Sequence, residues 1–147
     1  MTTVHDGYWC ETVARSPEAE GEWILGGYRA STPRLALRWM RRQARRLSDA
    51  LDPLPDRGPF PPGSLRQVGP HGPNPGRIFR EWAADLRFQE VQLAALVTGR
   101  HISVNAGGPD RVWGRCDADV YYSLSCRPIA LDFLTDWRLV APQYAHA

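Results

Sequence analysis

The sequence has 147 residues, of which 43% are hydrophobic and 23% are charged. This length and composition are typical of one soluble globular domain with a hydrophobic core. No apolar run approaches the roughly 18 residues of a membrane span, and the first residues show no secretory signal, which combines a basic with an apolar segment. We therefore expect a single cytoplasmic domain over residues 1–147 that makes no membrane contact.

The placement of charge is uneven. All 18 basic residues are arginine, which biased codon usage in a GC-rich bacterial genome explains without any functional reason. From Arg29 to Ser48, however, there are seven arginines and no acid, whereas the rest of the chain has 11 arginines and 16 acids. A chain with a formal net charge of only +2 has thus gathered its positive charge in one segment. This segregation predicts a basic surface.

The first predicted elements are two short strands and a helix. The strands span 8–14 ("YWCETVA") and 22–30 ("EWILGGYRA"), and the segment between them, "RSPEAEG", has the composition of a turn. A helix follows, because Ser31 or Thr32 can serve as its N-cap and the next residue is a proline, which suits the first helical position. Pro53 ends this helix.

The predicted helix has two chemically different sides. Apolar residues at 3-4 spacing form the side that we expect to face the core, namely Leu37, Met40, Ala44, Leu47 and Leu51. The opposite side carries Arg34, Arg38, Arg41, Arg42 and Arg45, and Leu35, Trp39 and Arg46 lie between the two sides. A solvated helix face usually mixes charges of both signs, so a row of arginines without an acid indicates a binding surface.

A long loop and a second helix are predicted next. The loop spans 53–76, because 13 of these 24 residues are proline or glycine, which suit neither a helix interior nor a central strand. The helix spans 76–100. Its apolar stripe, which we assign to the core, comprises Ile78, Trp82, Leu86, Leu93 and Leu96. Its remaining positions mix arginines with acids, so we assign it no partner.

Three strands are predicted after the second helix, over 101–106, 111–116 and 120–127, with turns at 107–109 ("GGP") and 117–119 ("DAD"). Alternation places one set of side chains toward the core: Ile102, Val104, Val112, Cys116, Val120, Tyr122, Leu124 and Cys126. The other, polar face carries His101, Ser103, Asn105, Arg111, Trp113, Arg115, Tyr121, Ser123, Ser125 and Arg127. The apolar tail that follows is expected to pack on the body as either strand or helix.

These elements predict an α+β fold in which two helices pack on one face of a mainly antiparallel sheet. The order is β-β-α-α-β-β-β plus a C-terminal tail, and helices grouped between antiparallel hairpins are typical of this class. The order resembles that of the small ribonuclease toxins of antitoxin-paired systems, which use arginine, histidine and tyrosine on a sheet face. The resemblance is one of topology and includes no diagnostic motif.

The sequence contains no motif for a metal, a cofactor or a nucleophile. Its three cysteines, Cys10, Cys116 and Cys126, lack the paired spacing of zinc sites, and its four histidines are scattered. It has no P-loop, no Rossmann fingerprint and no GxSxG. We therefore expect no metal and no cofactor, and a binding function in place of catalysis.

Two binding hypotheses use the arginine-rich helix. In the first, a non-enzymatic protein engages nucleic acid or another polyanion, and the binding residues are Arg34, Arg38, Trp39, Arg41, Arg42, Arg45 and Arg46. In the second, the same face docks an acidic protein partner or an acidic patch on a second copy of the chain, since Trp and Arg are frequent hot-spot residues at interfaces.

A third hypothesis is ribonuclease-like cleavage on the polar sheet face. His101 is the candidate acid or base, because its unperturbed pKa of about 6.5 suits proton transfer. Arg115 and Tyr121 complete the candidate catalytic group, and Arg111, Trp113 and Arg127 would bind the substrate on the same face. These residues share one site only if both turns have the predicted length.

Overall fold

The computed structural model describes residues 6–54, 61, 72–112 and 115–130, except for the side chains at 111 and 115–117. The elements follow the order β1 (Gly7–Ser16), β2 (Gly21–Ala30), α1 (Pro33–Leu51), α2 (Pro75–Ala84), α3 (Leu86–Val97), β3 (Ile102–Val112) and β4 (Arg115–Ile129). In this part of the chain, four antiparallel strands form one sheet in the order β2-β1-β4-β3.

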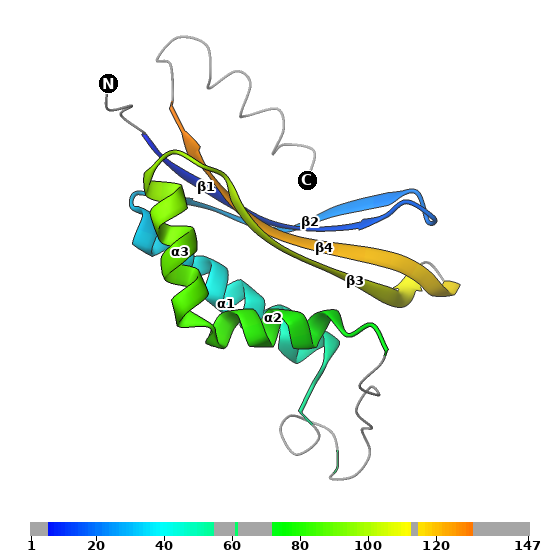
Figure 1. Cartoon of the computed structure of the whole chain (residues 1–147). Coiled ribbons are helices and arrows are strands. Elements are labelled where there is room, and N and C mark those ends of the chain that lie inside the picture. Colours follow the sequence, from blue (N-terminus) through cyan, green and yellow to red (C-terminus); the bar gives the residue numbers. More distant parts are fainter. Residues whose placement is uncertain (1–5, 55–60, 62–71, 113–114, 131–147) are drawn as a thin grey trace.

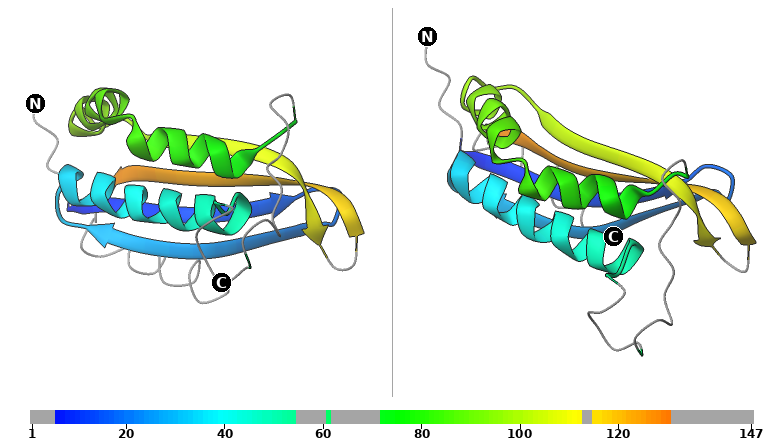
Figure 2. Two further views of the ribbon diagram at one scale, coloured as in Figure 1. Left: turned by 90° about the horizontal axis from the view of Figure 1, so that it is seen from below. Right: turned by 60° about the horizontal axis from the view of Figure 1, so that its bottom comes forward.

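The helices form a second layer on one face of the sheet (Figure 1). Seen from the helical side, α1 and α2 lie next to each other along the sheet, and α3 turns away from the line of α2 (Figure 2). α1 packs on β1, β2 and β4, whereas α2 packs on β3. The predicted α+β fold, with helices on one face of an antiparallel sheet, is confirmed. Within the described ranges, no helix is long and apolar enough to cross a membrane.

The first predicted helix has the expected ends and core side. The Thr32 hydroxyl caps α1 by accepting a hydrogen bond from the Leu35 amide at 3.2 Å, and a proline occupies the first turn. The buried side chains of α1 include Ala36, Leu37, Met40, Ala44 and Leu47, which pack with Phe79 of α2 and with the inner face of the sheet in one core cluster.

The C-terminal strands differ from the prediction in their turns. β3 and β4 form one long hairpin, whose register runs from Ile102 opposite Cys126 to Val112 opposite Arg115. The predicted turns at 107–109 and 117–119 are therefore wrong, because both segments lie inside strands. The predicted core face is nevertheless confirmed for most of its members. All of them are even-numbered, and the alternation of inward and outward residues continues through both segments. Ile102, Val112, Val120, Tyr122, Leu124 and Cys126 are buried, Val104 is partly buried, and the side chain of Cys116 lies outside the described residues.

The second predicted helix is interrupted at Asp85. The Asp85 amide donates to the Trp82 carbonyl at 3.1 Å and ends α2, while its carboxylate accepts from the Phe88 amide at 3.1 Å and caps α3. The interruption rotates α3 relative to the predicted stripe. Leu86 is consequently exposed, and Ile78 of α2 is exposed as well, so the prediction that these two residues face the core is wrong.

The inward side of α3 is occupied by two glutamines. Gln89 and Gln92 are only 3% and 7% exposed. The Gln89 amide donates to the carbonyls of Trp82 and Ala83 at 2.7 and 3.2 Å, and the Gln92 side-chain oxygen accepts from the Trp82 indole at 2.8 Å. Buried polar groups require such partners. Because the glutamines satisfy the end of α2, apolar side chains of α3 such as Val91 remain on the outside.

Arg80 of α2 holds the C-terminal end of α1. Its guanidinium donates to the Asp52 carboxylate at 2.7 Å, to the Asp52 carbonyl at 2.6 Å and to the Ser48 carbonyl at 3.3 Å. A cation at this end also complements the helix dipole. The predicted loop at 53–76 begins and ends beside this contact, and most of the loop lies outside the described residues, as does the tail from residue 131.

Two buried thiols lie face to face at the centre of the sheet. Cys10 of β1 pairs with Cys126 of β4 in the register, and their Sγ atoms are 3.3 Å apart. The hydrogen bond to Cys126, together with burial and the charge interaction between the two groups, raises the pKa of the Cys10 thiol well above its usual range. Both cysteines are free.

This raised pKa makes stability sensitive to alkaline pH. The Cys10 thiol ionises near its ordinary value of 9.0 in the unfolded chain but stays protonated when folded. Its contribution to stability is therefore complete below pH 9 and is lost as the pH rises further. Between pH 7 and pH 10, we expect the free energy of unfolding to fall by about 1 to 2 kcal/mol more in the wild type than in Cys10→Ala. Urea unfolding at both pH values measures this, and equal pH dependence of the two proteins contradicts it.

Candidate functional site

The exposed side of α1 is a continuous basic surface. We call it the arginine face, and it consists of Arg34, Arg38, Arg41, Arg42, Arg45 and Arg46. All of these side chains are exposed except Arg41, which is half-buried. The first acid of α1 is Asp49, so no carboxylate from the helix itself interrupts the arginines. Arginines spaced four residues apart repel one another and destabilise the helix by a few tenths of a kcal/mol per pair.

Three of these six arginines have a partner among the described residues, and one of them, Arg46, donates to the Gln43 side-chain oxygen of the same helix at 3.4 Å. Arg34 forms an ion pair with Glu90 of α3 at 3.5 Å, and both side chains are mostly exposed. Arg41 donates to the Gln89 side-chain oxygen at 3.0 Å. The side chains of Arg38, Arg42 and Arg45 form no ion pair or hydrogen bond with any residue in the described ranges.

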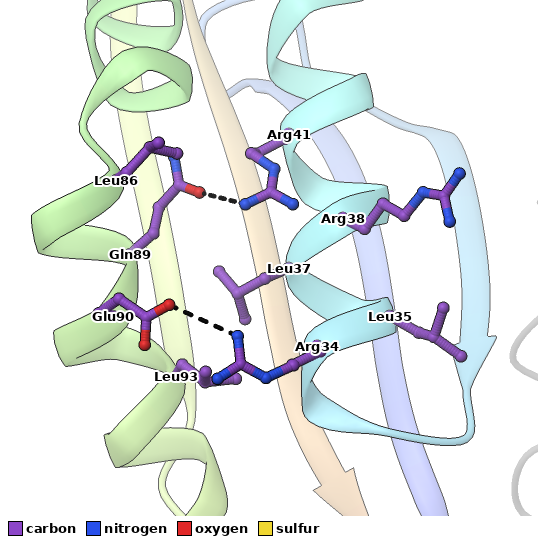
Figure 3. Close-up of a pocket in the computed structure, with 9 residues that line it drawn as sticks. All are labelled: Arg34, Leu35, Leu37, Arg38, Arg41, Leu86, Gln89, Glu90 and Leu93. Atoms are coloured by element: carbon purple, nitrogen blue, oxygen red, sulfur yellow. Dashed lines mark hydrogen bonds and ion pairs between the residues drawn. The ribbon is translucent and has the colours of Figure 1, made fainter.

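A groove of about 380 Å³ separates the first turns of α1 from α3. It is lined by Arg34, Leu35, Leu37, Arg38, Arg41, Leu86, Gln89, Glu90 and Leu93. In Figure 3, Arg34, Leu37 and Arg41 point from α1 toward α3, whereas Leu35 and Arg38 point away. Leu37 lies between the Arg34–Glu90 pair and the Arg41–Gln89 hydrogen bond (Figure 3). The groove therefore has an apolar middle with a cation at each end.

Trp39 lies on the opposite flank of α1. Its ring stacks on Tyr28 of β2 with centroids 6.0 Å apart, and it packs beside Gly26 of the same strand. Trp39 is half-buried. It therefore belongs to the contact between α1 and the edge strand, on the flank away from α3.

The candidate residues of the polar sheet face do not gather at one point. His101, Tyr121 and Arg127 are exposed. In the pairing of β3 with β4, Tyr121 lies opposite Gly107. His101 and Arg127 lie next to the Ile102–Cys126 pair, which is five residues away along the strands. His101 is one residue beyond that pair, so at about 3.3 Å per residue Tyr121 and His101 are roughly 20 Å apart along the strands. Arg115 pairs with Val112 still farther along the hairpin.

Other candidates on this sheet face are placed only in part. Arg111 is placed as part of β3 without its side chain, and Trp113 lies outside the described residues. A second cavity, of about 340 Å³, lies on the sheet beside Arg15, Asn105 and Tyr121. Among the residues that the structure describes, no three histidine, cysteine or acidic side chains come together as a metal site would require.

Sequence reasoning missed the contribution of α3 to the groove. The sequence predicts Leu86 in the core and Glu90 on a plain solvated face, whereas both line the groove. Leu93 packs against the core as predicted and lines the groove as well. The signal that points to the correct arrangement is Asp85, a preferred N-cap residue in the middle of the predicted helix. A second N-cap implies a second helix, whose buried side does not have to continue the apolar stripe of the first helix.

Comparison with known proteins gives no relative: no protein-family model, no curated protein and no solved structure matches this chain.

The support beneath the groove can be tested through Gln89. Replacing it with leucine removes the Gln89 donor from the Ala83 carbonyl and the acceptor from the Arg41 guanidinium, and it leaves the Trp82 carbonyl with the Asp85 amide alone. Because buried acceptors without a donor are costly, we expect Gln89→Leu to lower the free energy of unfolding by about 1 to 3 kcal/mol. The matched variant Glu90→Leu removes only an exposed ion pair and should change it by about 0.5 kcal/mol or less. Urea unfolding compares the two, and equal effects would contradict the assigned role of Gln89.

Proposed function

We propose that this protein is a non-enzymatic binding protein that engages an anionic macromolecule, either nucleic acid or an acidic protein surface, through the arginine face. The observation that carries the proposal is the state of Arg38, Arg42 and Arg45. They lie exposed on one helix face, and no acid of the described residues pairs with them. An anionic partner would supply the missing counter-charge.

The energetics of α1 support this proposal. Spacing of four residues repeats through Arg34, Arg38, Arg42 and Arg46, so each arginine repels the next. Binding of an anion relieves this repulsion. The exposed Arg34–Glu90 pair contributes little to stability, so Arg34 can exchange Glu90 for an anionic group of the partner at little cost.

The polar face of the sheet differs from the arginine face in its charge pattern. There Arg15 of β1 pairs with Glu22 of β2 at 3.4 Å, and the exposed Arg127 lies far along the sheet from this pair. The arginines of α1, by contrast, follow one another along a single helix without an intervening acid, so their charge forms one patch on the helical side. Such a patch attracts polyanions over a distance of about one Debye length, roughly 10 Å at 0.1 M salt.

The decisive variant is the triple substitution Arg38→Gln, Arg42→Gln and Arg45→Gln. At about 1 kcal/mol per contact, we expect it to weaken binding to heparin, single-stranded DNA or polyglutamate roughly 100-fold at low salt. The wild type should lose affinity steeply as salt rises, and the triple variant less steeply. Fluorescence anisotropy over a salt series measures both effects.

A matched control removes the same charge elsewhere. Arg87, Arg100 and Arg127 are exposed and form no ion pair with the described residues. Their triple glutamine variant has the same net charge as the test variant and should bind like the wild type. The proposal fails if both triple variants lose affinity equally, or if the wild type binds none of the three probes. Light scattering on the free protein distinguishes docking on a second copy from docking on another molecule.

A further inference from the structure

We infer that the groove between α1 and α3 docks an acidic amphipathic helix of a partner protein. Its carboxylates would lie on the arginine face, and its apolar side chains would enter between Leu37, Leu86 and Leu93. This inference rests on the proposed function, because the arginine face supplies the charge recognition, and it names the partner for that face.

The first support is the apolar strip on α3. Leu86, Leu93 and Val97 follow one another at spacings of seven and four residues, which keeps them on one side of the helix. Leu86 is 60% exposed although it lies directly beside the groove. A leucine in this position stays in water unless an apolar group covers it.

The second support is the pairing of that strip with fixed positive charge. Arg41 is held by Gln89, and Gln89 is held in turn by the carbonyls of Trp82 and Ala83. The cation at this end of the groove is therefore already in position before a partner arrives, which reduces the entropy lost on binding. Arg34, at the other end, is held only by an exposed ion pair.

The geometry of an amphipathic helix matches this combination. Acids spaced four residues apart on a helix are about 6 Å from one another, as are the arginines of the row Arg34, Arg38 and Arg42. Apolar residues three or four positions away project from the neighbouring side of the same helix. One helix can therefore present carboxylates to α1 and leucine-like side chains to α3 at the same time.

Nucleic acid fits the groove less well. Its phosphates match the arginines, but unpaired bases stack best on aromatic rings, and the described lining of the groove holds leucines and no aromatic residue. The aromatic residue of α1, Trp39, is stacked on Tyr28 on the flank that faces β2. The leucines are therefore the feature that favours a protein partner.

The experiment compares three fluorescent probes on the full chain. The first is a short helical peptide with glutamates at four-residue spacing and leucines on the adjacent side. The second has the same charge, with alanines in place of the leucines, and the third is a single-stranded DNA. Because one buried leucine contributes at least a ten-fold gain in affinity, we expect the leucine peptide to bind about ten-fold more tightly than the alanine peptide.

Two matched variants locate the apolar contact. Leu86→Gln alters the groove, whereas Val91→Gln alters a residue of α3 that is similarly exposed, at 64%, but does not line the groove. Both substitutions are at the surface, and circular dichroism verifies that both variants fold. We expect Leu86→Gln to abolish the preference for the leucine peptide and Val91→Gln to retain it.

Three results would overturn the inference while leaving the proposed function intact. They are equal binding of the two peptides, tighter binding of the DNA with no effect of Leu86→Gln, and a dimer in light scattering that Leu86→Gln dissociates. In each of these cases the arginine triple variant would still lose affinity for the anionic ligand. If the arginine triple variant binds every probe like the wild type, the proposed function fails as well.

Discussion

Two carbonyls, those of Trp82 and Ala83, lie at the interruption between α2 and α3, where a continuous helix would have paired them. They are buried, so donors must reach them. Gln89 donates to both carbonyls, and the Asp85 amide also donates to that of Trp82. This requirement orients α3, because its glutamine-bearing side has to face the end of α2. The apolar side chains of α3 are thereby turned outward, and the edge that carries Leu86 comes to border α1. The groove follows from a hydrogen-bonding requirement of the backbone.

The same arrangement links the core to the charged surface. Gln89 contacts α2 with its amide nitrogen and Arg41 with its oxygen. One buried side chain thus satisfies the helix end and positions a cation of the arginine face. α1 contributes an apolar side to the core and a basic side to solvent, and Leu37 is the point where the two sides meet in the groove (Figure 3).

Local patterns in the sequence were sufficient to predict α1 and the inner face of the sheet. Thr32 followed by a proline marks the start of α1, and the alternation of even-numbered residues survives the wrong turns at 107–109 and 117–119. Those turns were wrong because "GGP" and "DAD" are compatible with both a turn and an extended strand, and only pairing between distant residues decides between them. Local periodicity could not predict which side of α3 faces inward, because that orientation depends on carbonyls at the end of α2 that need a hydrogen-bond donor. The pattern of charge in the sequence was enough to predict the arginine face. The groove beside it could not be predicted without knowing the position of α3.

Arg80 brings together two points of the chain that are far apart in sequence. Its contacts with Asp52 and the close approach of Gly76 to Asp52, where an added Cβ would lie 2.6 Å from the Asp52 Cβ, hold the ends of the intervening segment next to each other. The packing of α1 against α2 is therefore set by these end contacts. Since the entropic cost of closing a loop grows by only about 0.6 kcal/mol for each doubling of its length, these end contacts are compatible with connections of quite different length between α1 and α2. A longer or shorter connection would accordingly leave the helical layer, and with it the arginine face, in place.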